Sequence, residues 1–109
     1  MDGYSVWATM QAKPGREGDA RAFLEEAARR ITFGEPGTTS FHALDLGEGR
    51  FAIFNTFADE FALQAHVGGE TAAWVMAQNA ELFTAPYAIT RGRLFAQKRN
   101  GEVAVAEAA

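Results

Sequence analysis

The sequence predicts an α+β fold in which a four-stranded antiparallel sheet carries its helices on one face. Two observations support this. The chain has 109 residues, of which 48% are hydrophobic, which suits one compact domain with a real core. Its periodic segments follow the order β-α-β-β-α-β, with the second helix in two pieces. That order is the ferredoxin-like arrangement.

The first strand and the first helix follow from two different hydrophobic periods. Residues 4–12 alternate between two faces, which is the period of a strand. After the turn sequence "KPGREGD", the next apolar side chains recur at helical spacing. This expected stripe consists of Ala20, Phe23, Leu24, Ala27 and Ile31. We therefore expect an amphipathic helix lying on a sheet.

Turn residues divide the rest of the chain. The breaker "GEPGTTS" precedes "TSFHALDL" and "RFAIFNTF", which flank the link "GEG" and predict a β-hairpin. Asp59 is the expected N-cap of a short helix that ends at Val67, and Gly68 and Gly69 stop it. A second helix then covers 71–83 and a last strand covers 87–98. We expect one domain over 1–98 and a flexible tail over 99–109.

Neither face of the predicted sheet is convincingly polar. Phe51, Ile53 and Phe57 alternate with Ala52 and Phe54 along one strand. Helices on one side cannot cover both faces, and a large exposed apolar face invites aggregation. We therefore expect a symmetric homodimer in which two sheets pack face to face into an α+β barrel.

Composition and missing motifs exclude several classes of protein. The formal charge of −4 with scattered Lys and Arg argues against nucleic-acid binding. The chain has no cysteine, and its N-terminal residues resemble no signal peptide, so we expect a cytoplasmic protein with no membrane partner. It contains no dinucleotide, Walker or HExxH motif and only two histidines, so no cofactor or metal is expected.

Several polar or aromatic residues are expected between the helices and the sheet. His66 is either a cap of its helix or a base able to deprotonate a small acidic molecule. Asn55 lies in a nearly apolar strand, so its amide is either tied to backbone or aimed at a ligand. Trp74 has the spacing of a core residue.

Three more candidates have a structural alternative as well. His42 could equally face the barrel interface, together with Thr39. Tyr87, beside Pro86, could be the first packing residue of its strand, and Arg91 could pair with an acidic neighbour. None of these residues is a motif alone.

Four fragments in order resemble the antibiotic biosynthesis monooxygenase family of small dimeric α+β barrel proteins. They are "AKPGRE", "EPGTTSFHAL", "FAIFNTFADE" leading into "AHVGG", and "AELFTAPYAITRGRLFAQK". The resemblance covers residues 4–98. It implies oxidation of a phenolic, quinol or polycyclic aromatic substrate with O₂ and without metal, flavin or nicotinamide.

The resemblance also implies roles for the candidate residues. His66 matches the family's common helix histidine, and Asn55 is implied as a second catalytic residue that donates a hydrogen bond. Trp74 and Arg91 are implied substrate-binding residues, and His42 and Tyr87 are further candidates for substrate binding because we expect them between the helices and the sheet. Haem-degrading relatives use an asparagine, a tryptophan and a histidine in another order, so haem is not expected. A barrel that binds a hydrophobic metabolite without catalysis, or an isomerase or cyclase, is the alternative function.

Overall fold

We analysed a computed structural model of the chain, which describes residues 3–84 and 88–105. In chain order its elements are β1 (Tyr4–Gln11), α1 (Glu17–Gly34), β2 (Thr38–Gly47), β3 (Arg50–Phe57), α2 (Glu60–Val67), α3 (Glu70–Leu82), β4 (Ala88–Arg93), β5 (Ala96–Arg99) and β6 (Glu102–Val105). The first seven elements confirm the predicted ferredoxin-like order, including the split second helix.

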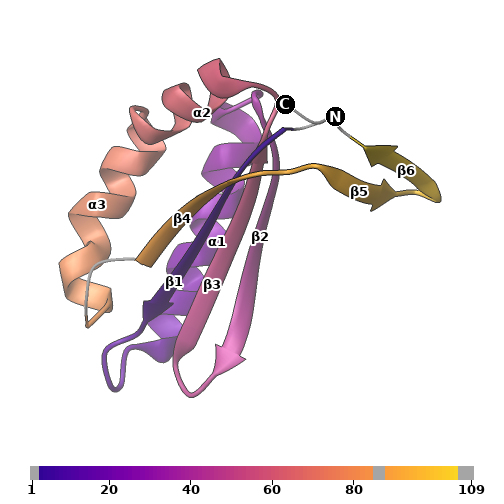
Figure 1. The fold of residues 1–109 in the computed structure, drawn as a ribbon. Helices are drawn as coiled ribbons and strands as arrows, with labels where there is room; N and C mark the ends of the chain where they lie inside the picture. The colour runs from indigo at the N-terminus through magenta and orange to yellow at the C-terminus, as the bar shows by residue number, and fades with distance from the viewer. Residues whose placement is uncertain (1–2, 85–87, 106–109) are drawn as a thin grey trace.

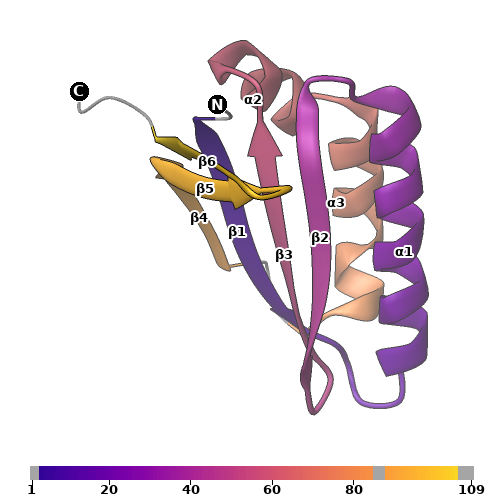
Figure 2. The same cartoon turned by 90° about the vertical axis from the view of Figure 1, so that its right-hand side faces the viewer.

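The main sheet has the strand order β2-β3-β1-β4, and every pairing in it is antiparallel. The helices lie on one side of this sheet, and the β5–β6 hairpin projects on the other side (Figures 1 and 2). We call the helix side the inner face and the opposite side the outer face. The predicted α+β fold class is therefore confirmed.

Strand register decides which side chains reach the inner face. Val6 of β1 pairs with Asn55 of β3, and Asn55 pairs in turn with Phe41 of β2. Val6 also pairs with Arg91 of β4, so these four side chains form one row on the inner face. The next row on the outer face holds Trp7, Phe54 and His42 with Thr90.

The core lies between the inner face and α1. The apolar stripe predicted for α1 is buried in full, from Ala20 at 0% exposure to Phe23 at 7%. Ala20, Phe23 and Leu24 of this stripe pack with Ala8, Met10 and Phe51 of the sheet. Packing of this apolar face against the sheet therefore stabilises the helix.

The end of the chain differs from the expectation. We predicted one strand over 87–98 followed by a tail, but β4 ends at Arg93 and residues 96–105 form a separate hairpin. Asn100 and Gly101 have φ angles of 52° and 79°, which is the conformation of a type I′ turn. The Asn-Gly pair is a hairpin signal that the prediction overlooked. The predicted boundary at residue 98 falls inside this hairpin.

Candidate active site

An inner cavity of about 290 Å³ lies between the inner sheet face and the three helices. Its walls are largely apolar, with Ile53, Phe41 and Val75 among them. Polar side chains converge on it from β3, β4, α2 and α3, namely Asn55, Arg91, His66 and Thr71. Apolar walls with a few converging polar groups are typical of a small-molecule site.

Asn55 is completely buried in the centre of β3, at 0% exposure. Its Nδ2 lies 3.5 Å from Nε2 of His66, at the long limit of a hydrogen bond. Its Oδ1 is buried and has no hydrogen-bond partner among residues 3–84 and 88–105. Because buried amides are normally satisfied, the free oxygen is an acceptor available to a bound molecule.

His66 links Asn55 to an acidic residue. Its Nδ1 lies 2.5 Å from Oε1 of Glu35, which also accepts a hydrogen bond of 3.0 Å from Oγ1 of Thr38. The side chains of His66 and Glu35 are only 16% and 14% exposed. The His66 ring also packs on Phe57, with ring centroids 5.1 Å apart.

This arrangement fixes the roles of the two ring nitrogens of His66. A carboxylate can only accept hydrogen bonds, so Nδ1 must donate its proton to Glu35. In the neutral imidazole Nε2 then carries the lone pair, which suits the amide donor of Asn55. In this neutral tautomer Nε2 is the proton acceptor on the side of the inner cavity, the state that a general base needs.

Local structure brings the three residues together. Glu35 is the C-cap of α1 and begins a turn in which the backbone N–H of Thr38 donates to its carbonyl at 3.0 Å. Asp59 caps α2 as predicted, its Oδ1 accepting from the N–H of Ala62 at 2.8 Å. His66 then lies in the last turn of that helix.

A close approach between α2 and the turn after Glu35 requires glycine at position 37. A Cβ on Gly37 would lie 2.7 Å from Cβ of Ala62. The glycines that interrupt the second helix have a similar basis, because a Cβ on Gly69 would lie 2.8 Å from the carbonyl oxygen of Ala65. The break lets α2 and α3 follow different directions (Figure 1).

A second hollow lies on the other side of His66. We call this hollow the outer groove, although it lies among the helices and not on the outer face of the sheet. It has a volume of about 670 Å³ and runs between the end of α1 and the helices α2 and α3. Glu35 lines the outer groove and not the inner cavity, whereas Asn55 lines the cavity and not the groove. His66 lines both, so the histidine stands between them.

The remaining predicted residues are distributed over three places. Arg91 lines the inner cavity from the edge strand β4, and none of the ion pairs among residues 3–84 and 88–105 includes it. Trp74 is not among the cavity-lining residues. Its ring packs 4.6 Å from the ring of Phe23, and the guanidinium of Arg30 lies 4.0 Å above it. Trp74 therefore packs α3 against α1, which is the core role that its spacing indicated.

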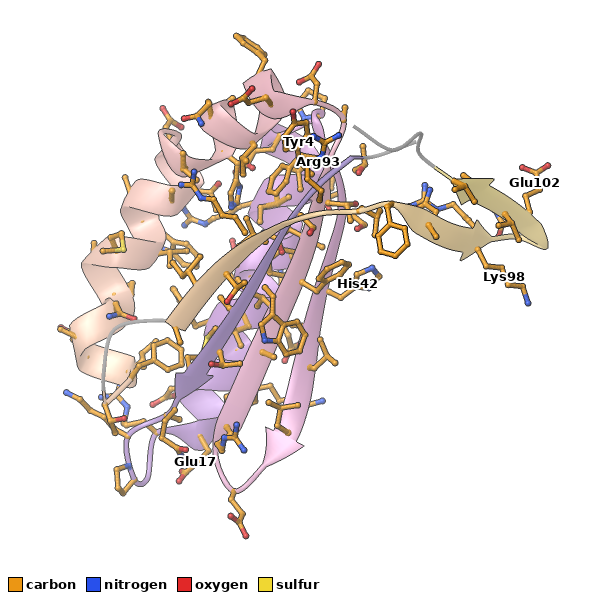
Figure 3. The ribbon with its side chains drawn as sticks, in the orientation of Figure 1. Tyr4, Glu17, His42, Arg93, Lys98 and Glu102 are labelled. Carbon is orange, nitrogen blue, oxygen red and sulfur yellow. The ribbon has the colours of Figure 1, made fainter. Side chains whose placement is uncertain are left out.

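His42 does not lie between the helices and the sheet, where we expected it. Its ring is stacked on Phe54, with centroids 6.3 Å apart, in the outer-face row. Figure 3 shows His42 beside β2 and pointing away from α3. The cause is strand parity, because the neighbouring Phe41 takes the inner position opposite Asn55. Tyr87 lies outside the described residues.

The sequence interpretation missed Glu35, which it treated as part of a turn. One signal was available. The carboxyl end of a helix favours cations, so an acidic residue at the C-cap is unfavourable there unless it is paired. The last turn of α1 offers no basic residue, so the partner had to come from elsewhere in the fold.

Two features of the described residues bear on the kind of site. In residues 3–84 and 88–105, no three side chains of His, Asp or Glu gather closely enough to hold a metal ion. None of the helices in that part of the chain is long and apolar enough to span a bilayer.

The fold and the site define a small α+β protein built around a small-molecule cavity with a histidine and an asparagine in its wall. Comparison with known families makes this specific. The antibiotic biosynthesis monooxygenase family model matches residues 3–77, so the chain belongs to that family. A comparison with curated proteins gives no match.

Solved structures agree with this assignment. The chain is similar to a protein of unknown function from Nitrosomonas europaea, with 37% identity, a TM-score of 0.82, and 89% and 93% of the two chains covered. It is also similar to Rv0793 from Mycobacterium tuberculosis, with 26% identity, a TM-score of 0.73, and 89% and 97% covered. A structure described as an antibiotic biosynthesis monooxygenase shares the fold at 17% identity and a TM-score of 0.70, with 81% and 94% covered.

Proposed function

We propose that the protein is a cofactor-independent monooxygenase that oxidises a phenol or quinol of one or two rings with O₂. The observation that carries the proposal is the inner cavity, where the buried amide of Asn55 and the half-buried imidazole of His66 lie next to each other in a largely apolar wall. Family membership supports the reaction class. The cavity's volume of about 290 Å³ is near the lower limit of ligand sites, roughly 300–1,000 Å³, which favours small substrates.

The proposed reaction begins with a proton transfer. Nε2 of His66 accepts the phenolic proton, and the amide N–H of Asn55 donates to the resulting oxyanion. The electron-rich ring then reacts with O₂ in the apolar cavity. The substrate supplies four electrons, so that one oxygen atom becomes a carbonyl of the product and the other leaves as water. Arg91, at the edge strand, balances the negative charge of the phenolate.

Homodimer formation is part of this proposal. Trp7 and Leu44 on the outer face are 39% and 38% exposed, and Phe54 lies beside them in the sheet. Two such faces packed together would cover these side chains and form the α+β barrel expected from the sequence. The inner cavity lies on the opposite side of the sheet, so each protomer would keep its own site.

Oxygen consumption tests the reaction. Purified protein, treated with chelator, is mixed with a panel of naphthols and one-ring quinols, and uptake is followed with an oxygen electrode. We expect enzyme-dependent uptake that falls at least tenfold in His66→Gln and Asn55→Ala, in line with the roughly 10²–10⁴-fold contribution of a general base. His42→Gln is the matched control, because it removes the only other histidine from the opposite sheet face. Absence of uptake with every substrate would refute the proposal.

A second function uses the same groups. A base at Nε2 of His66 with an amide donor beside it also suits proton abstraction next to a carbonyl, as an isomerase or cyclase requires. Product formation without oxygen uptake would identify this case. Binding of an aromatic ligand without any conversion would identify a non-catalytic barrel.

A further inference from the structure

We infer that Glu35 is a positioning residue that acts through His66, and that small molecules can reach Glu35 from the outer groove. It holds the proton on Nδ1 of His66 and so keeps Nε2 as the proton acceptor facing Asn55 and the inner cavity. The kinetic part of this inference rests on the proposed function, whereas the part that concerns the imidazole does not.

The contacts of the Glu35 carboxylate support this role. Its Oε1 receives the 2.5 Å contact from Nδ1 of His66 and the 3.0 Å bond from Thr38, so the carboxylate is held on two sides. Its Oε2 is buried without a hydrogen-bond partner in the part of the chain that the structure describes. An acidic side chain at the C-cap of α1 gains nothing from the helix dipole, so its favourable interactions are those with His66 and Thr38.

The position of the two hollows adds a second argument. Glu35 lines the outer groove, Asn55 lines the inner cavity, and His66 lines both. The imidazole therefore presents Nδ1 to a carboxylate on the groove side and Nε2 to a substrate on the cavity side. A small molecule that enters the groove can reach Glu35 without competing for the cavity.

The tautomer of His66 can be read directly by nitrogen-15 NMR of the imidazole side chains, without any substrate. The chain has only two histidines, and His42→Gln assigns the signals. We expect the Nδ1–H form for His66 in the native protein. Glu35→Gln should retain it, because the amide oxygen still accepts from Nδ1, whereas Glu35→Leu should lose it.

Kinetics supply a second readout. Turnover should fall roughly 10²-fold in Glu35→Leu, the lower end of a general base's contribution, and less in Glu35→Gln, with KM nearly unchanged in both. Glu70→Gln is the matched control, because Glu70 also lines the outer groove but makes no contact with His66 among the described hydrogen bonds. Its turnover should equal that of the native protein.

Chemical rescue tests the groove. In Glu35→Ala, acetate should restore a measurable part of the turnover by raising kcat, and it should not compete with the substrate. An Nε2–H tautomer in the native protein, full turnover in Glu35→Leu, or acetate that acts only as a competitor of the substrate would each overturn the inference. If no substrate supports oxygen uptake but the tautomer behaves as expected, the proposed function fails and the positioning role stands. If uptake occurs and the tautomer is Nε2–H, the reverse holds.

Discussion

The buried pair of Glu35 and His66 has a consequence for stability that can be measured with a double-mutant cycle. Replacing His66 by leucine leaves the Glu35 carboxylate, whose side chain is 14% exposed, with Thr38 as its one described donor. A lost hydrogen bond to a buried charged group costs about 1.5–3 kcal/mol. With a denaturant slope of about 2 kcal/mol per molar, the urea midpoint should fall by roughly 1 M.

The double variant Glu35→Leu with His66→Leu should be more stable than His66→Leu alone, because it removes the unpaired carboxylate as well. Unfolding is followed by circular dichroism at one fixed protein concentration, since dimerisation would add to the apparent stability. Equal slopes in all four proteins are required for the comparison. Simple addition of the two single effects would refute the claim that these side chains interact energetically.

Three further outcomes follow from single positions. Gly37→Ala should lower the free energy of unfolding by about 1–3 kcal/mol, because α2 must move away from the new Cβ. Gly34→Ala, at the end of α1, has open space and no positive φ, so it should raise the free energy of unfolding by about 0.4–1 kcal/mol in the same urea titration. Trp7→Glu should convert the proposed dimer to a monomer in sedimentation while the far-ultraviolet spectrum is retained; a variant that still sediments as a dimer would exclude the outer face as the interface. Asp59→Ala should cost about 0.5–2 kcal/mol through loss of the N-cap, and an unchanged thermal midpoint would contradict this.

Local patterns predicted much of the fold. The stripe of α1, the Asp59 cap and the glycine break are each decided by neighbouring residues, so a single sequence reveals them. The face of the sheet that a strand residue occupies is not decided by its neighbours in sequence. His42 was misplaced because both alternating sets of β2 contain apolar side chains, and only pairing with β3 decides which set faces the helices.

The candidate site was predicted in part for the same reason. Asn55 and His66 each attract attention alone, as polar residues in apolar surroundings. Glu35 lies 31 positions before His66, and only the tertiary fold joins the end of α1 to the end of α2. Trp74 has the right residue type for a cavity wall, but the rotation of α3 turns it toward α1.

The order of strands in the sheet also affects which strand detaches first when the native state opens locally. β4 is paired on one side only, with β1, and every one of its residues is exposed. This pairing closes a long stretch of chain, since the hydroxyl of Ser5 donates to the carbonyl of Gly92 across 87 positions. An edge strand held this way is an early segment to detach in native-state opening, so its amide protons should exchange with solvent sooner than those of β3. β4 carries Ile89 and Arg91 in the cavity wall, so such local opening would widen the inner cavity while the other strands of the sheet stay folded.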